Sequence, residues 1–380
     1  MEEERLIRRK TMKSWEANVR KVVPYVPGEQ PGEETVIKLN TNENPYPPAP
    51  GVKEALEHLP TDRLRKYPDP AASELVCALA ERYGVKPEQV FVGVGSDDVL
   101  AMAFLTFFNS EKPVLFPDIT YSFYDVWADL FRIPYQTMPL NDDFEICPED
   151  YFAANHPNGG VIFPNPNAPT GLELELEAVE RIVRENPDSV VIVDEAYVDF
   201  GARTALPLVE TYDNLLVVQT FSKSRSMAGM RIGFAIGSEE LIACLNDVKY
   251  SFNSYTMSQA AIAAGTAAVK DEVYFRRTVQ AVVETREWTK EKLRELGFVF
   301  GDSTANFISA SHPQVPAAEL FRALREAHIY VRYFNQPRID NYLRISIGTR
   351  EEMETLINFL KNYRNSSGRV RAHAAQTVRT

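Results

Sequence analysis

Two basic residues in the segment TFSKSRSMAGMR, residues 220–231, have side chains suited to amine chemistry and to anion binding. Lys223 carries a primary amine, which attacks carbonyl carbons and forms imines once it is deprotonated. Arg231 carries a planar guanidinium, which binds phosphate through two parallel hydrogen bonds. Most lysines in a serine-rich loop are solvated surface charges, so the segment alone does not decide between catalysis and solvation.

Polar residues follow several short apolar runs of the chain, including the run LLVVQTF that precedes Lys223. Runs such as VFVGVG, VIFP and VVIV are rich in Val, Ile and Phe, which is typical of parallel strands buried on both faces. In open parallel sheets, ligands bind beyond the carboxyl ends of the strands, so residues there are expected to converge on one crevice. The residues that follow these runs are Gly95, Ser96, Asp97, Tyr121, Asn167, Asp194, Tyr197, Ser222 and Lys223.

The residues predicted at this crevice suit pyridoxal phosphate. This cofactor needs a lysine that forms an imine with its carbonyl and a carboxylate that keeps its pyridine nitrogen protonated, which Lys223 and Asp194 provide. The phenol of Tyr197 is a donor for the ring oxygen, and the ring of Tyr121 is a stacking surface. A helix N-terminus, hydroxyl groups and an arginine suit the phosphate. Each residue alone has an ordinary structural explanation, but their joint occurrence at successive strand ends favours the functional one.

The sequence resembles the fold type I pyridoxal-phosphate-dependent aminotransferases over roughly residues 35–362. The segments that carry the resemblance are LNTNENPYPP, YPDP, GVGSDD, ITYSFY, NPNAPTG, VVIVDEAYVDF, TFSKSRSMAGMRIGF, TANFI and YLRISIGTREE. DEAY and SK…GMR are typical of the superfamily, whereas NENPYPP and LRISIGTREE are similar to the histidinol-phosphate aminotransferase group. The resemblance implies a ping-pong aminotransferase of histidine biosynthesis, with histidinol phosphate as amino donor and 2-oxoglutarate as keto-acid acceptor.

The resemblance also implies a role for individual residues around the cofactor. Lys223 matches the lysine that carries the cofactor as an imine and moves the α-proton. Asp194 matches the partner of the pyridine nitrogen, and Tyr197 matches the phenol at the ring oxygen. Tyr121 matches the stacking residue. The residues that match the phosphate cradle are Ser96, Asp97, Ser222 and Arg231, and we expect Gly95 before them to bind the cofactor as well.

Four further residues match positions that bind substrate or come from a second subunit. Tyr67 in KYPDP matches a tyrosine that reaches the phosphate from the other subunit, which implies a homodimer with shared sites. Arg344 in YLRIS matches an arginine that binds substrate. Arg332 in YVRYF and Tyr25 in VVPY match residues near the phosphate end of the substrate.

One departure from the family pattern concerns the turn NPNAPTG. An asparagine usually stands directly before PTG and bonds the ring oxygen, whereas this chain has Ala168 there and Asn167 one position earlier. Either Asn167 makes that contact through a shifted turn, or Tyr197 makes it alone. The phosphate loop also reads SDD where an acidic pair ending in glutamate is usual.

The order of apolar and amphipathic segments predicts an α/β fold with two domains. An arm over residues 1–45 packs with the small domain and precedes a large cofactor domain at 46–270, in which helices cover both faces of a mostly parallel sheet. A long amphipathic helix then leads into a smaller α+β domain at 271–364. Residues 365–380 are polar and lack periodicity, which predicts a disordered tail.

Composition argues against several other classes of protein. A formal net charge of −12 over 380 residues disfavours nucleic acid as a partner, because that binding needs Lys/Arg patches. The three cysteines and five histidines lack disulfide or metal-ligand spacing, so we expect no metal and a reducing compartment. The N-terminus has no secretory apolar stretch and no run approaches the roughly 20 apolar residues of a membrane span. We therefore expect a cytoplasmic protein without a membrane partner.

Other functions use some of the same residues. An aromatic or broad-range amino-acid aminotransferase, or a phospho-amino-acid decarboxylase, has the same fold, and the decarboxylase releases carbon dioxide without a keto-acid acceptor. A pyridoxal-phosphate-binding regulator usually carries an added DNA-binding domain, for which the sequence before residue 35 has no room. A nicotinamide-dependent dehydrogenase needs a third glycine that GVGSDD lacks.

Overall fold

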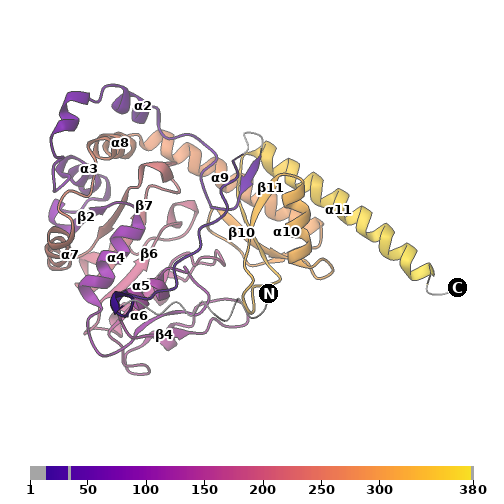
Figure 1. Cartoon of the computed structure of the whole chain (residues 1–380), viewed down its shortest axis with the longest axis horizontal. Helices are drawn as coiled ribbons and strands as arrows, with labels where there is room; N and C mark the ends of the chain where they lie inside the picture. Colours follow the sequence, from indigo (N-terminus) through magenta and orange to yellow (C-terminus); the bar gives the residue numbers. More distant parts are fainter. Residues whose placement is uncertain (1–13, 33–35, 378–380) are drawn as a thin grey trace.

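The computed structural model describes residues 14–32 and 36–377 and shows two β-sheets with helices packed against them (Figure 1). The larger sheet has seven strands in the order β2-β8-β7-β6-β5-β3-β4. Its neighbouring strands are parallel except for the two pairs made by β8. The strands are β2 (Val90–Gly93), β3 (Val114–Pro117), β4 (Tyr135–Met138), β5 (Gly160–Pro164), β6 (Val191–Asp194), β7 (Leu215–Thr220) and β8 (Gly233–Ile236). The predicted mostly parallel sheet is confirmed.

Burial explains why the central strands of this sheet read as continuous apolar runs. Every residue of β5, β6, β7 and β8 is buried, because helices exclude water from both faces. One face packs against α2 (Pro50–Glu57), α3 (Ser73–Tyr83), α6 (Leu176–Arg184) and α8 (Gln259–Lys270). The other face packs against α4 (Ser96–Phe107), α5 (Tyr124–Phe131) and α7 (Glu239–Phe252). The edge strand β4 has three exposed residues.

The smaller sheet has five strands in the order β1-β11-β12-β10-β9. They are β1 (Ile37–Leu39), β9 (Val299–Phe300), β10 (Phe307–Ser311), β11 (Ile329–Tyr333) and β12 (Leu343–Ser346). The first of them comes from the N-terminal part of the chain and pairs with β11 in parallel. This sheet packs with α10 (Ala317–Glu326), with α11 (Arg350–Thr377) and with α9 (Glu272–Glu295), the long helix that connects the two domains.

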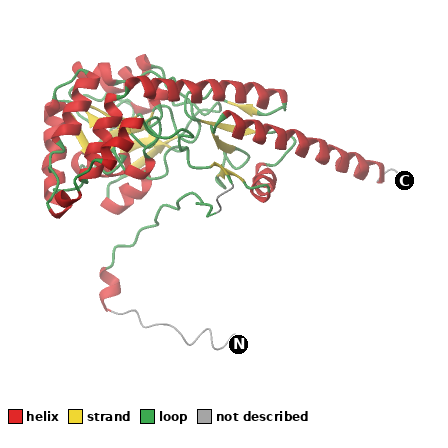
Figure 2. Ribbon diagram, turned by 90° about the horizontal axis from the view of Figure 1, so that it is seen from above, coloured by secondary structure: helices red, strands yellow, loops and turns green. Residues whose placement is uncertain are grey.

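The predicted disordered tail and the predicted arm lie at the two ends of the chain. The sequence predicts a disordered tail from residue 365, whereas α11 continues to Thr377. A helix lengthens at little cost once its first turns have formed, and AHAAQ near its end contains good helix formers. Residues 14–32 of the predicted arm contain one short 3-10 helix and run as a loop along one side of the molecule (Figure 2). Residues 1–13 lie outside the described residues.

Short 3-10 helices occupy several of the connections. They are η1 (Ser14–Asn18), η2 (Thr61–Arg65), η3 (Pro87–Gln89), η4 (Pro148–Tyr151), η5 (Val198–Phe200), η6 (Leu206–Glu210) and η7 (Ala228–Met230). Within the described residues, none of the helices combines the length and the apolar character that crossing a membrane requires.

Candidate active site

A cavity of about 380 Å³ lies at the carboxyl ends of β5, β6 and β7, beside the N-terminus of α4. This is where an open parallel sheet places its ligand site, because polar residues can end buried strands there. The predicted site residues that line this cavity are Ser96, Asp97, Tyr121, Asp194, Tyr197, Ser222, Lys223 and Arg231. The structure therefore brings together eight residues that lie up to 135 positions apart in the sequence, from Ser96 to Arg231.

Lys223 stands in the turn after β7 and presents its amine to the cavity. Its Nζ donates a hydrogen bond to the main-chain oxygen of Thr41 at 3.0 Å and lies 5.7 Å from the ring centre of Tyr197. The Nδ2 of Asn44 donates to the main-chain oxygens of Lys223 and Ser224 at 3.1 and 3.3 Å. The turn that carries the amine is thus fixed by the segment around residues 41–44.

Asp194 ends β6 and is a carboxylate with only 4% of its surface exposed. Its Oδ2 accepts a hydrogen bond from the Tyr124 hydroxyl at 2.9 Å, and its Oδ1 accepts one from the main-chain N–H of Ala196 at 3.2 Å. Burial raises the pKa of Asp194 to about 6, and these two hydrogen bonds partly oppose the rise. A buried carboxylate of this kind is stabilised by a cationic partner, which a protonated ring nitrogen supplies.

Arg231 lies against the N-terminus of α4, where the chain leaves room for it by using glycine. Gly95 has a φ of 87°, and a Cβ there would lie 2.5 Å from the Arg231 guanidinium. Arg231 Nη2 donates to Asp97 Oδ2 at 3.1 Å, and its Nη1 donates to Ser222 Oγ at 3.4 Å. The free N–H groups of the helix, the Ser222 hydroxyl and the guanidinium together form a cradle that fits a phosphate.

Tyr121 separates this cavity from a second one. Its hydroxyl donates to Asp97 Oδ1 at 2.6 Å, and burial together with the Asp97 charge raises the pKa of Tyr121 well above its usual value. Its ring packs edge-on against Tyr124, with 5.8 Å between the ring centres. Tyr121 and Ala168 line both cavities, so the two are neighbours with a shared wall.

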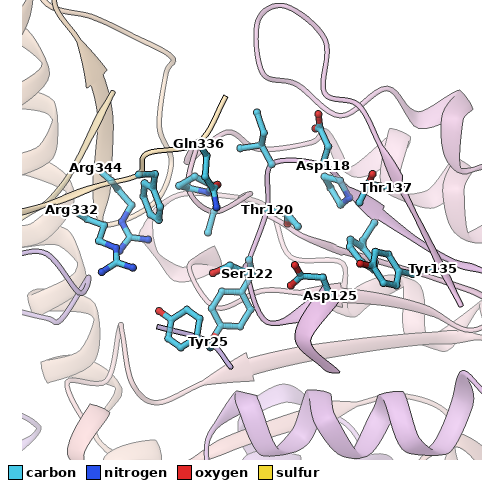
Figure 3. A pocket seen from close by; sticks show the side chains of 17 residues that line it. Tyr25, Asp118, Thr120, Ser122, Asp125, Tyr135, Thr137, Arg332, Gln336 and Arg344 are labelled. Atoms are coloured by element: carbon cyan, nitrogen blue, oxygen red, sulfur yellow. The ribbon is translucent and has the colours of Figure 1, made fainter. Parts of the chain in front are cut away.

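The second cavity, of about 180 Å³, contains the predicted substrate-binding residues (Figure 3). The guanidinium groups of Arg332 and Arg344 lie next to one another at one end, with the Tyr25 ring close by. Arg344 Nη2 donates to the main-chain oxygen of Asn40 at 3.0 Å, while its buried Nε has no hydrogen-bond partner among the described residues. Burial lowers the pKa of Arg344. An anionic ligand would satisfy this desolvated cation.

A match to a known protein family identifies the family to which this chain belongs. The family described as "Aminotransferase class I and II" matches residues 34–360 of the chain. The chain belongs to this family. The aminotransferase therefore transfers an amino group from an amino donor to a keto-acid acceptor.

Named relatives of this aminotransferase are similar over almost their whole length. It is 56% identical to histidinol-phosphate aminotransferase 2 of Dechloromonas aromatica, over 91% of this chain and 98% of that one. It is 52% identical to the histidinol-phosphate aminotransferase of Lactococcus lactis subsp. lactis, over 92% of this chain and 96% of that one.

Solved structures share the fold at lower sequence identity. The histidinol-phosphate aminotransferase of Clostridium acetobutylicum superposes with a TM-score of 0.80 at 20% identity, over 87% of this chain and 100% of that one. The enzyme from Sinorhizobium meliloti, solved in complex with pyridoxal-5'-phosphate, gives a TM-score of 0.77 at 24% identity over 86% and 91%. The predicted fold class of this aminotransferase is thereby confirmed.

Like Gly95, the predicted cofactor residue Asn167 does not line the cavity. Its Nδ2 donates to the main-chain oxygen of Ile119 at 3.0 Å and to Thr170 Oγ1 at 3.2 Å, and its Oδ1 accepts from Thr120 Oγ1 at 3.0 Å. Ala168, not Asn167, lines the cavity. The amide of Asn167 is thus hydrogen-bonded within and beside its own turn, which favours the alternative in which Tyr197 bonds the ring oxygen alone.

Tyr67 also lies outside the cavity of its own chain. It is 79% exposed and stacks on Tyr255, with 4.5 Å between the ring centres. The aminotransferase chain alone therefore does not use this tyrosine at the Lys223 site.

Several residues of the site were not identified from the sequence. Thr41 and Glu43 line the Lys223 cavity, Asn42 donates to the Tyr197 hydroxyl, and Tyr124 donates to Asp194. Thr41, Asn42 and Glu43 lie in the polar run NTNEN, directly after a short apolar segment. Polar side chains next to a buried strand need hydrogen-bond partners, so this run was a signal for all three. Tyr124 carried no signal of its own.

Proposed function

We propose that this aminotransferase uses pyridoxal phosphate and transfers the amino group of histidinol phosphate to 2-oxoglutarate. The observation that carries the proposal is the shared wall between the Lys223 cavity and the cavity that contains Arg332 and Arg344. A donor with an amine at one end and a phosphate at the other fits this arrangement, because the amine can approach Lys223 while the phosphate meets two guanidinium groups. The names of the relatives that are 52–56% identical support the same donor.

The residues of the Lys223 cavity fit the cofactor. The phosphate would be held by the α4 N-terminus with Ser96, Ser222 and Arg231, and the ring by Asp194 at its nitrogen. Tyr197 would donate to the ring oxygen and Tyr121 would cover one face of the ring. When bound, pyridoxal phosphate supplies an electron sink for the carbanion that forms when the donor loses its α-proton.

Lys223 would act first as the attachment point and then as the base. With the donor in place, its free Nζ would take the proton from the carbon that bears the donor's amine. Thr41 O accepts a hydrogen bond from Nζ at 3.0 Å and so holds the amine at the cavity that both residues line. Arg332 and Arg344 orient the donor so that the bond to that proton faces Nζ.

A homodimer is part of this proposal. Tyr67, Tyr255, Phe252 and Leu64 are large apolar residues with between 45% and 79% of their surface exposed in the single chain. A second copy of the chain would cover them and bring the exposed Tyr67 hydroxyl toward the partner's phosphate cradle. A cytoplasmic location remains a prediction from the sequence.

The experiment that tests the proposed donor is a panel of half-reactions. The enzyme loaded with pyridoxal phosphate is mixed separately with histidinol phosphate, phenylalanine, aspartate and glutamate, and loss of the visible cofactor band is followed. We expect histidinol phosphate to react fastest. If it reacts no faster than phenylalanine, the donor is wrong and only the class of reaction survives; release of carbon dioxide without an acceptor would favour the decarboxylase alternative.

A further inference from the structure

The left-handed backbone turn at Asn42 aims an amide at the hydroxyl group of Tyr197. Asn42 is 1% exposed and has a φ of 55°, a conformation that asparagine adopts more readily than most residues. Its Nδ2 donates a hydrogen bond to the Tyr197 hydroxyl oxygen at 3.0 Å. The two residues are 155 positions apart in the sequence.

The orientation of this amide is fixed by contacts with the small domain. The main-chain N–H of Asn42 donates to Ser346 Oγ at 2.9 Å, and Ser346 Oγ donates back to Asn42 Oδ1 at 3.0 Å. The main-chain oxygen of Asn42 accepts from Asn306 Nδ2 at 3.0 Å. Because Oδ1 takes the hydroxyl proton of Ser346, Nδ2 must face Tyr197.

The direction of the hydrogen bond from Asn42 leaves the phenol of Tyr197 free to donate its own proton. Its oxygen accepts from Asn42, and it makes no other hydrogen bond with the described residues, so its own proton remains available to the cavity that it lines. The ring is held edge-on against Phe307, with 5.0 Å between the ring centres. Asn42 and Phe307 together leave Tyr197 little freedom to turn.

The turn NPNAPTG supplies no second donor to this part of the cavity. Ala168 lines the cavity with a methyl group, and the amide of Asn167 is used by Ile119, Thr120 and Thr170. When a single side chain donates to the ring oxygen of a cofactor, its position matters more. If that donor is misplaced, the anionic oxygen has no hydrogen-bond partner.

We propose that Asn42 is a positioning residue that holds Tyr197 as the single side-chain donor to the ring oxygen of the cofactor. This rests on the proposed function, because it requires pyridoxal phosphate in the Lys223 cavity. Asn42 thereby compensates for the amide that is absent at Ala168, and Ser346 and Asn306 make that compensation depend on the small domain.

The test is the pH at which the visible band of the enzyme-bound cofactor changes. Asn42→Gly removes the amide and keeps the backbone, because glycine adopts a φ of 55° freely. A donor to the anionic ring oxygen favours the deprotonated form of the bound cofactor, so weakening it moves the transition upward, by about half a pH unit. Ser346→Ala leaves Asn42 in place but frees its amide, and is expected to shift the transition in the same direction by a smaller amount.

Two further variants distinguish a specific effect of Asn42 on Tyr197 from a general disturbance of the fold. Asn186 is also fully buried, and its Nδ2 donates to the main-chain oxygens of Tyr151 and Ile182 at 2.7 Å each, outside both cavities. Asn186→Gly removes the same kind of amide and is expected to leave the transition unchanged. Ala168→Asn, introduced together with Asn42→Gly, places a new donor at the cavity wall and is expected to bring the transition back toward the wild-type value.

The outcomes are distinct. An unmoved transition in Asn42→Gly and Ser346→Ala overturns the assignment of Asn42, and so does an equal shift in Asn186→Gly. A double variant that shifts as far as Asn42→Gly alone overturns the compensation for Ala168. A wild-type protein that forms no visible band with pyridoxal phosphate overturns the proposed function itself.

Discussion

The amine of Lys223 donates a hydrogen bond to the main-chain oxygen of Thr41, with 3.0 Å between the two atoms. Thr41 belongs to the segment that joins β1 of the smaller sheet to α2 of the larger domain. The same segment reaches Tyr197 through Asn42 and the turn after Lys223 through Asn44. The reactive amine is therefore positioned by a stretch of chain that belongs to neither domain alone.

Replacing Lys223 by alanine tests the assignment of the nucleophile. Lys223→Ala removes the only amine that lines the cavity among the described residues, so we expect no visible cofactor band and a loss of turnover of about 10⁴-fold or more. The control is Lys249→Ala, since Lys249 is a buried lysine whose Nζ, like that of Lys223, donates to a main-chain oxygen, that of Pro70. Turnover retained by Lys223→Ala would refute the assignment.

Arg231 is expected to determine how tightly the cofactor is held. Arg231→Ala removes the guanidinium that contacts Asp97 and Ser222 at the phosphate cradle, so the dissociation constant of pyridoxal phosphate should rise by about 10–100-fold. Cofactor titration followed by absorbance measures this change. Arg203→Ala, which removes a half-exposed arginine that pairs with Glu173 and Glu175, should leave the dissociation constant unchanged. Equal effects of the two variants would contradict a phosphate role for Arg231.

Much of this site was predictable because buried parallel strands leave a clear pattern in sequence. Asp194 ends a strand that is buried along its whole length, and Lys223 comes three residues after the end of another such strand. Polar residues at these points lie at the ligand edge of the sheet. The start of a helix at Ser96 was also predictable, because the glycine before it can adopt the backbone conformation that the turn into the helix requires. The local sequence pattern therefore predicted that these residues lie at the same edge of the sheet.

What could not be predicted depends on hydrogen bonds between distant segments. The contacts of Thr41 with Lys223 and of Asn42 with Tyr197 join residues 182 and 155 positions apart, and no periodicity encodes such pairs. The direction of the Asn167 side chain was equally hidden, because it depends on whether Ile119 and Thr120 offer it partners. The sequence therefore predicted that Lys223 and Asp194 lie at the same cavity, but not which residues hold them there.

Arg344 is expected to bind substrate rather than cofactor. Arg344→Lys keeps the charge but loses the planar fork, so kcat/KM should fall by about 10–100-fold while the visible cofactor band stays at its wild-type position. Arg338→Lys is the matched control, because Arg338 lies nearby and donates instead to Asp118 and to the main-chain oxygens of Leu140 and Asn141. A changed cofactor band in Arg344→Lys would place this arginine against the cofactor instead.

Glu195 predicts a pH dependence of folding stability. It is buried, its Oε1 accepts from the main-chain N–H of Ala205 at 2.6 Å, and burial raises its pKa from 4.5 to about 7. Because the folded pKa lies above the unfolded one, this carboxyl group stabilises the fold most below about pH 4.5, and its contribution is lost as the pH rises toward 7.

The variant Glu195→Gln removes that dependence. The free energy of unfolding of the variant minus that of the wild type should therefore increase by about 3 kcal/mol between pH 4.5 and pH 8. Urea denaturation of the cofactor-free proteins at several pH values measures it, and the contributions of other carboxyl groups cancel in the difference. A difference that is the same at both pH values would show that Glu195 is not perturbed in the folded chain.

Tyr67 predicts that active sites are shared between two chains. It lies outside the cavity of its own chain and is largely exposed, so in a homodimer it would serve the partner. Tyr67→Ala is mixed with Lys223→Ala under conditions of subunit exchange. Half of the dimers are then hybrids in which one site combines an intact Lys223 with an intact Tyr67, so activity should recover to about a quarter of wild type.

The matched control mixes Lys223→Ala with Asp194→Ala. Both of these residues line the same cavity of one chain, so every site of the hybrid lacks one of them and no recovery is expected. Recovery in both mixtures would show that the gain comes from subunit exchange itself and not from Tyr67. If Tyr67→Ala alone is inactive and its mixture with Lys223→Ala recovers no activity, the tyrosine acts within its own chain. In that case one site of each hybrid lacks Tyr67 and the other lacks Lys223.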